Sequence, residues 1–271
     1  MTWDGTRTLA IVNQKGGVGK TTTAINLSAA LAEIEQKTLV VDLDPQGALS
    51  VGLGIEGASL EDTVYTAMMD PEFDINRVVY PLGPFLDAIP SNIELASAEM
   101  ELIAEIRREY ILQRMLDPIA GGYDYIVIDC PPSLGLLTIN ALTACHEGVI
   151  PMQCEYFAMR GIRMLLQAID WIKARVNNEL ELGGILVTMY STGTNHHREV
   201  LEELRSVFGT KVFKAVIQKS IRFAEASVAS QSLVEYAPGH KGTQSYRALA
   251  QEIVEQSPAE WPGAKAKPRG V

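Results

Sequence analysis

Residues 13–22 read NQKGGVGKTT, and this stretch decides the fold. An apolar run at 8–13 (TLAIVN) precedes it, and a helix-like stretch at 21–34 follows it. A glycine-rich loop between a strand and a helix is the usual setting of a phosphate-binding loop. The glycines let backbone N–H groups turn toward phosphate oxygens, and the helix N-terminus adds positive potential. The stretch therefore predicts a P-loop at the start of an α/β fold.

The loop differs from the usual P-loop pattern at one position. The pattern G-x-x-x-x-G-K-[ST] requires glycine at 14, where this chain has Gln14, and an additional lysine, Lys15, follows it. Lys20 can reach the β- and γ-phosphates of a nucleotide, and the Thr21 hydroxyl can ligate Mg²⁺. We expect ATP and Mg²⁺ as the ligands. The residues expected at the phosphates are Lys15, Gly16, Gly17, Val18, Gly19, Lys20, Thr21 and Thr22.

Beyond the loop, short apolar runs alternate with longer helix-like stretches, which is typical of βαβ units on a parallel sheet. We expect an α/β fold over residues 1–256: a single P-loop NTPase domain with a mostly parallel twisted sheet and helices on both faces. The tail at 257–271 holds three prolines and two glycines and is expected to be flexible. The expected strands are 8–13, 38–43, 123–129, 148–152, 184–190 and 211–217, and the expected helices are 21–34, 93–116, 158–176, 195–207 and 244–256.

Composition excludes several classes of protein. The chain has 271 residues, of which 47% are hydrophobic and 21% charged, unlike a disordered or collagen-like chain. It lacks the run of about 18 apolar residues that a membrane span needs. The three cysteines form no CxxC motif, which argues against a disulfide scaffold or a zinc site. A net charge of -10 weighs weakly against nucleic acid as a partner, although the excess acid lies in residues 1–189.

Carboxylates follow two of the expected strands. Asp42 and Asp44 end the strand at 38–43, and alternation places them on the same side. Asp129 ends the strand at 123–129 and is followed, after one residue, by Pro131 and Pro132. The carboxyl edge of an α/β sheet is where ligands bind, and carboxylate oxygens suit Mg²⁺. These residues therefore predict a metal and hydrolysis site beside the loop.

Together these motifs resemble the ParA/MinD family of deviant Walker A ATPases, whose loop reads KGGxGKT[ST]. The likeness covers about residues 8–256 in the right order and is nearest to the chromosomal ParA (Soj) branch. It implies that Lys15 reaches across a dimer interface to the partner's nucleotide. It also implies that Asp44 orients or activates the attacking water, that Asp42 and Asp129 lie in or near the Mg²⁺ shell, that the loop at Pro131 and Pro132 senses the γ-phosphate, and that Met189 neighbours the base.

The C-terminal third departs from the family pattern. Where relatives often carry IPRNxRxxEAPS, residues 217–227 read IQKSIRFAEAS, so Gln218 replaces a proline that commonly lies beside adenine. Lys219 and Arg222 keep the two basic positions. By the resemblance these two contribute to non-specific DNA binding, and charge and position add Arg198, Lys214 and Arg247.

The sequence thus predicts a ParA-type switch. ATP would close a homodimer that binds double-stranded DNA without sequence preference, and a ParB-like or other adaptor would stimulate slow hydrolysis and release it. The cycle would segregate a chromosome, a plasmid or other large cargo. We expect a cytoplasmic, nucleoid-associated protein that does not bind membranes.

Two alternatives belong to other functional classes. A MinD-like membrane switch needs a C-terminal amphipathic helix, which prolines at 258, 262 and 268 would break. A metabolic ATP-dependent enzyme on the same fold would use the loop to activate a small molecule.

Overall fold

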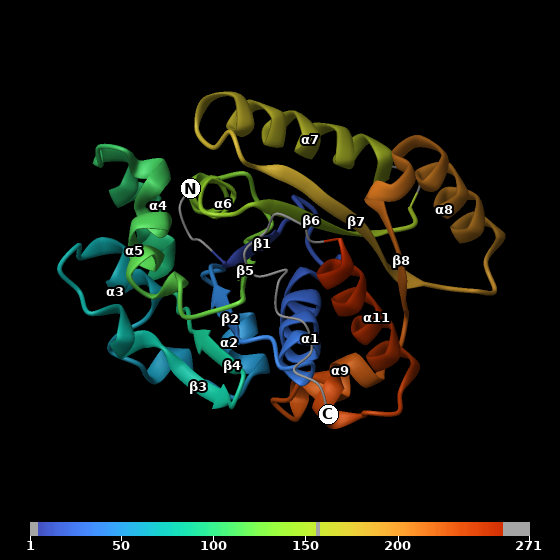
Figure 1. The fold of residues 1–271 in the computed structure, drawn as a ribbon, viewed down its shortest axis with the longest axis horizontal. Coiled ribbons are helices and arrows are strands. Elements are labelled where there is room, and N and C mark those ends of the chain that lie inside the picture. Colours follow the sequence, from blue (N-terminus) through green and yellow to red (C-terminus); the bar gives the residue numbers. More distant parts are fainter. Residues whose placement is uncertain (1–4, 156–157, 257–271) are drawn as a thin grey trace.

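The apolar run before the loop forms a central strand, β1, in a computed structural model that describes residues 5–155 and 158–256. The sheet has eight strands in the order β3-β4-β2-β5-β1-β6-β7-β8 (Figure 1). All neighbours pair in parallel except β3 and β4, which are antiparallel. The bounds are β1 (Arg7–Ile11), β2 (Thr38–Asp42), β3 (Tyr80–Gly83), β4 (Leu86–Ile89), β5 (Tyr125–Asp129), β6 (Glu147–Gln153), β7 (Glu181–Tyr190) and β8 (Val212–Gln218).

Helices cover both faces of this sheet, so the expected α/β class is confirmed. The α-helices are α1 (Lys20–Glu33), α2 (Ala48–Gly52), α3 (Val64–Met69), α4 (Leu95–Glu101), α5 (Ile111–Ala120), α6 (Leu136–Thr143), α7 (Ala158–Arg175), α8 (Asn195–Phe208), α9 (Arg222–Val228), α10 (Leu233–Tyr236) and α11 (Lys241–Glu255). Short 3₁₀ turns are η1 (Gly57–Ser59), η2 (Ile75–Val78), η3 (Leu102–Ala104), η4 (Arg108–Tyr110) and η5 (Gly209–Lys211).

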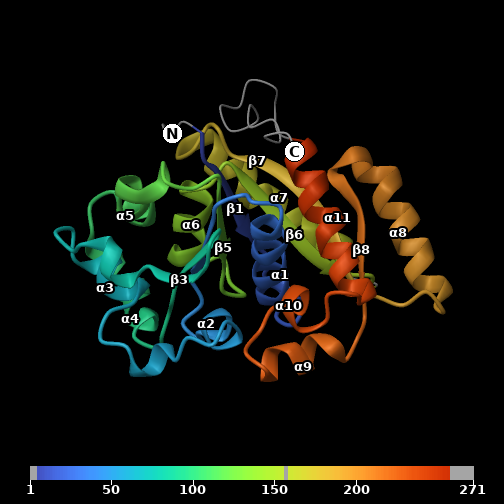
Figure 2. The ribbon, with the colours of Figure 1, turned by 60° about the horizontal axis from the view of Figure 1, so that its bottom comes forward.

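Each face of the sheet has its own apolar core, because successive strand residues point to opposite faces. Ala10 and Val12 join the core under α3 to α8, whereas Leu9 and Ile11 join the core under α1, α2, α10 and α11. Figure 2 shows α1 beside α10 and α11, so segments from the two ends of the chain cover one face together.

The predicted helix at 93–116 is wrong, because the chain breaks there into α4, η3, η4 and α5. Glu105 is extended and Arg107 has a left-handed backbone, with φ 56°. Within this stretch, Ile103 and Ile106 are 61% and 86% exposed, whereas Leu102 and Leu112 are buried. Most of the stability of a helix in a protein comes from packing of its apolar face. Because the side chains of Ile103 and Ile106 are not packed, the apolar spacing in the sequence is not enough to form one continuous helix.

Other expectations have mixed outcomes. The β3–β4 hairpin was not predicted, and the tail at 257–271 lies outside the described residues. Cys130, Cys145 and Cys154 are buried as free thiols. No helix in the described part of the chain is both long and apolar enough to cross a membrane.

Candidate functional site

The glycine-rich loop connects the end of β1 to the first turn of α1. Gly17 and Gly19 have φ angles of 72° and 87°, in the left-handed region that a side chain rarely adopts. Gly19 is the N-cap of α1 and has no side chain to cap the helix. Within residues 5–155 and 158–256, the N–H groups of Gly16 to Gly19 donate no hydrogen bond. The loop therefore offers a row of unpaired donors at a helix N-terminus, which suits phosphate.

Neighbouring strands hold this loop through its carbonyl groups. Gln153 at the end of β6 donates from Nε2 to the Gly17 oxygen at 2.7 Å, and the Thr188 hydroxyl of β7 donates to the Val18 oxygen at 2.8 Å. Asn13 donates to the Pro151 oxygen at 2.8 Å. Gln153 and Thr188 are not among the predicted site residues, and their contacts with the loop span more than 130 residues of the chain.

The two lysines of the loop lie in different surroundings. Lys20 is 7% exposed, and its Nζ lies 3.4 Å from the Lys15 oxygen. Burial lowers the pKa of the Lys20 ammonium, and the Asp129 carboxylate opposes that shift. Lys15 is exposed, and its ammonium forms an ion pair with Glu155 just beyond β6. Lys20 is thus built into the loop, whereas Lys15 lies at its surface.

Asp42 and Asp129 face each other as register partners at the carboxyl ends of β2 and β5. Asp42 is fully buried and accepts hydrogen bonds from Ser50 N at 2.9 Å, Ser50 Oγ at 2.7 Å and Asp44 N at 3.1 Å. Burial raises the pKa of the Asp42 carboxyl to about 6, against the effect of these bonds. Asp42 therefore stabilises the turn after β2 and connects it to Ser50 in α2. Its role near Mg²⁺ stays a prediction.

Asp129 differs because its carboxylate lacks partners. It is 1% exposed, and neither oxygen is hydrogen-bonded within the described residues. Burial and then Asp42 raise its pKa well above the ordinary value, while the Thr21 hydroxyl and Lys20 lower it. A buried, unsatisfied carboxylate beside a hydroxyl is a fitting donor set for Mg²⁺, which takes oxygen ligands and keeps several from phosphate and water.

The remaining predicted residues lie around this centre. Asp44 is half-buried, and its Oδ1 accepts from Gln46 N at 2.9 Å. Pro131 is buried and Pro132 exposed in the segment between β5 and α6. No group of three His, Cys, Asp or Glu side chains in the described residues forms a metal cage.

A pocket of about 310 Å³ lies beside the loop. It connects Gly19 and Thr22 of the loop region with Met189 at the end of β7 and with Gln218 at the end of β8. Met189 has a φ of 50° and is 37% exposed. The structure thus places the predicted base neighbour, Met189, in a cavity that continues from the phosphate loop, and Gln218 lines the same cavity. The other lining residues are Thr188, Ile217, Lys219, Ser220, Phe223, Ala224, Ser227 and Tyr246.

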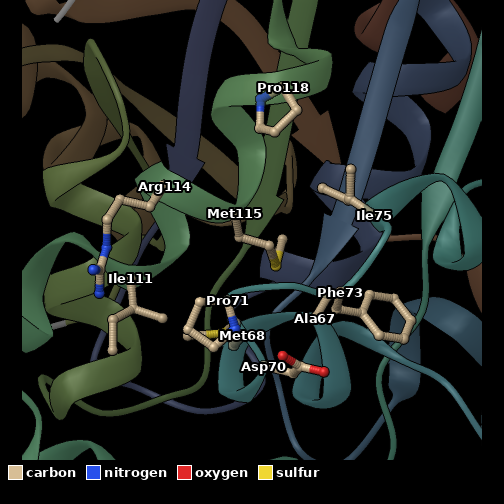
Figure 3. A pocket seen from close by; sticks show the side chains of 10 residues that line it. All are labelled: Ala67, Met68, Asp70, Pro71, Phe73, Ile75, Ile111, Arg114, Met115 and Pro118. Atoms are coloured by element: carbon tan, nitrogen blue, oxygen red, sulfur yellow. The ribbon is translucent and has the colours of Figure 1, made fainter.

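A further pocket, of about 190 Å³, lies between α3 and α5 (Figure 3). Met68, Phe73, Ile111 and Met115 give it a mainly apolar lining, with Arg114 at its side. It contains none of the predicted site residues, so the sequence motifs select the pocket beside the loop and not this one.

The basic positions lie on several elements of the C-terminal third: Arg198 on α8, Lys214 on β8, Lys219 after β8, Arg222 at the start of α9 and Arg247 on α11. Arg222 pairs with Glu225 at 2.7 Å, and Arg247 pairs with Glu33 at 2.6 Å. The other three side chains are exposed and form no ion pair within the described residues.

Comparisons with known proteins agree with this geometry. A family model described as an AAA domain matches residues 6–182. The sporulation initiation inhibitor Soj of Bacillus subtilis (strain 168) is 46% identical over 245 residues, which cover 90% of this chain and 97% of Soj. The chromosome partitioning protein ParA of Myxococcus xanthus is 42% identical over 257 residues, 94% of this chain and 90% of that protein.

Solved structures share the fold. Cobyrinic acid a,c-diamide synthase from Mycobacterium smegmatis, in a crystal structure with ADP and magnesium, has a TM-score of 0.80 and 36% identity over 91% of this chain and 93% of that chain. An ATP complex of McdA from Cyanothece has a TM-score of 0.82 at 23% identity, over 92% of this chain and 97% of that chain.

Proposed function

The chain belongs to the ParA/Soj family of AAA-domain ATPases, and we propose that it is an ATP-driven DNA-segregation switch. ATP and Mg²⁺ close a homodimer, the dimer binds double-stranded DNA without sequence preference, and an adaptor of the ParB kind stimulates hydrolysis and releases it. The cargo is a chromosome, a plasmid or another large assembly. The cycle takes place on the nucleoid, in the cytoplasm.

The observation that carries this proposal is the pair of lysines in one loop, one buried and one exposed. Lys20 lies at the base of the loop, where its charge offsets the β- and γ-phosphates. Lys15 is exposed and paired only with a surface carboxylate, so it is free to move toward a nucleotide on a second subunit at little energetic cost. A lysine used across an interface has to be accessible, and Lys15 is.

The remaining groups of the site have separate roles in hydrolysis. Thr21 and Asp129 would hold Mg²⁺, which neutralises charge on the phosphate oxygens when bound. The unpaired loop N–H groups bind the phosphates and orient them. Asp44 would orient or activate the attacking water. The segment at Pro131 and Pro132 follows Asp129 directly, so it can respond to the phosphate beside that residue.

Retention of DNA under three nucleotide conditions tests this proposal. Purified protein is passed over immobilised DNA without nucleotide, with ADP and with ATP plus Mg²⁺, and its mass is measured by light scattering. We expect DNA retention and a dimer only with ATP. Asp44→Ala should prolong both, because bound ATP persists, and Lys15→Ala should prevent both. DNA retention that is equal under all three conditions would contradict the proposal.

A metabolic ATP-dependent enzyme is the second candidate, because the Mycobacterium smegmatis neighbour is named as a synthase at 36% identity. Such an enzyme would need a small-molecule substrate for rapid ATP turnover and would show no ATP-dependent DNA retention. Measuring ATP hydrolysis with DNA and with an adaptor, in the absence of any added metabolite, separates the two functions.

A further inference from the structure

Two carbonyl oxygens of the phosphate loop are bound from outside the loop by a pair of neighbouring strand residues. Gln153 and Thr188 are register partners where β6 and β7 end, and they hold the oxygens of Gly17 and Val18, respectively. We propose that Gln153 and Thr188 are positioning residues that fix the phosphate-binding geometry of the loop before a nucleotide arrives. This inference rests on the proposed ATPase function.

The planar peptide group couples each of these carbonyl oxygens to the N–H group of the next residue. In a trans peptide the carbonyl oxygen of one residue and the N–H of the next point in opposite directions, and the described chain has no cis peptide. Holding the Gly17 oxygen toward Gln153 therefore turns the Val18 N–H the other way. Holding the Val18 oxygen toward Thr188 likewise points the Gly19 N–H away from Thr188. Both N–H groups are among the unpaired donors of the loop.

Thr188 is the stronger of the two anchors. It is 2% exposed on β7, where the sheet restricts its movement. Its hydroxyl lies 2.8 Å from the Val18 oxygen and 3.1 Å from the Met152 oxygen, and its single proton favours the nearer acceptor. A buried hydrogen bond to a rigid strand holds the Val18–Gly19 peptide at the left-handed Gly19, where glycine alone would leave the backbone free to turn.

Gln153 also connects the loop to the neighbouring pocket. Its Nε2 lies 2.7 Å from the Gly17 oxygen and 2.8 Å from the Met189 sulfur. Met189 and Thr188 both line the pocket of about 310 Å³ beside the loop. The ends of β6 and β7 thus orient the N–H donors for phosphates and form one wall of the cavity beside them. Removing either hydrogen bond should therefore weaken nucleotide binding.

Isosteric variants test this role. Thr188→Val keeps the shape and removes the hydroxyl, Thr188→Ser keeps the hydroxyl as a matched control, and Gln153→Met keeps the length and removes the amide. The dissociation constant for ATP with Mg²⁺ is measured by calorimetry. Backbone ¹⁵N order parameters of Val18 and Gly19 are measured in the protein without nucleotide. Losing one hydrogen bond should weaken ATP binding about 3- to 10-fold in the Thr188→Val and Gln153→Met variants.

The outcomes separate this inference from the proposed function. Thr188→Val should lower the order parameters of Val18 and Gly19 and raise KM for ATP more than it lowers kcat, and Thr188→Ser should restore both. If the unmodified protein binds ATP but the Thr188→Val variant binds it equally well with unchanged order parameters, the positioning role is wrong. The same holds if Thr188→Ser is as weak as Thr188→Val. If the unmodified protein does not bind ATP, the proposed function itself fails.

Discussion

The phosphate loop and the basic positions of the C-terminal third carry their charges in opposite ways. In the loop, Lys20 is 7% exposed and lies among buried carboxylates at the strand ends. In the C-terminal third, Lys214 and Lys219 are exposed and unpaired within the described residues, and Arg222 is paired with a neighbour on its own helix. Burial fixes the charge of Lys20 in the loop, whereas the basic side chains of the C-terminal third lie at the surface, some of them in ion pairs.

This difference predicts how strongly substitutions in each region affect function. A buried charge interacts strongly and specifically, because little water screens it, so single changes should have large effects. Exposed charges act on DNA phosphates as a sum, so single changes should have small effects and combined changes large ones.

The largest effect is expected at Lys20. Lys20→Ala removes the buried positive charge from the phosphates and should reduce ATP hydrolysis by at least about 100-fold. Steady-state phosphate release measures it, and the fold is checked by circular dichroism. Lys37→Ala, at an exposed lysine outside the loop, is the matched control and should hydrolyse ATP normally. Near-normal hydrolysis in the Lys20→Ala variant would contradict the expectation that a single change at the buried charge has a large effect.

The second effect concerns exposed charge. Reversing two charges together, in Lys219→Glu with Arg222→Glu, should weaken ATP-dependent DNA retention by about 10-fold or more and reduce its salt dependence, because fewer phosphate contacts release counterions. Arg247→Ala should change retention much less, since Arg247 is engaged by Glu33 and the Pro238 oxygen. Retention is measured at several salt concentrations. An equal loss in the two variants would mean that the pairing seen at Arg247 is irrelevant to DNA.

The third effect is a pH dependence of stability. The folded pKa of Asp42 is about 6, above its ordinary 3.8, so the folded state binds this proton more tightly than the unfolded chain. The free energy of unfolding should therefore fall as pH rises from about 4 to about 6, by about 2–3 kcal/mol from this group. Urea unfolding of the protein and of Asp42→Asn across this range measures the difference. A constant difference between the two proteins would show that Asp42 does not titrate there.

The smallest effect is a gain in stability at Asp129, the carboxylate that we propose for the metal site. Asp129 is buried, and neither of its oxygens is hydrogen-bonded within residues 5–155 and 158–256. Asp42 repels this carboxylate more than Lys20 attracts it. Asp129→Asn should raise the free energy of unfolding by about 1–2 kcal/mol near pH 8, without ligands, while it impairs Mg²⁺-dependent hydrolysis. Thermal unfolding without nucleotide tests this. If Asp129→Asn instead lowers the free energy of unfolding, the Asp129 carboxylate is needed to stabilise the buried ammonium of Lys20.

Local motifs made much of the site predictable. The residues at 13–22, at 42–44 and at 129–132 each carry their chemistry in one contiguous stretch, and parallel strands bring those stretches to one edge. The bounds of all six expected strands and of the helix after the loop agree with the structure to within three residues, because apolar runs covered on both faces have a clear sequence pattern. By contrast, β3 and β4 are only four residues long, and β3 carries Pro81 and Gly83, which weaken a strand pattern.

What sequence could not reveal depends on distant contacts. Thr188 and Gln153 look like ordinary strand residues, and their bonds to the loop exist only because β6 and β7 lie beside β1. The break near Arg107 was missed for a related reason: periodicity shows which residues are apolar but not whether anything will cover them. The pairing of Arg247 with Glu33, across 214 residues, was hidden in the same way.

The packing of α10 and α11 against α1 has a consequence for the order of biosynthesis. The Thr23 hydroxyl of α1 lies 3.2 Å from that of Tyr246, and Asn26 accepts a hydrogen bond from Leu233 N at 2.7 Å. A ribosome delivers the chain from its N-terminus. The loop that binds phosphate is therefore among the first segments made, yet its helix gains its last cover only when residues near 250 emerge. An unfinished chain carries the complete motif without the complete site.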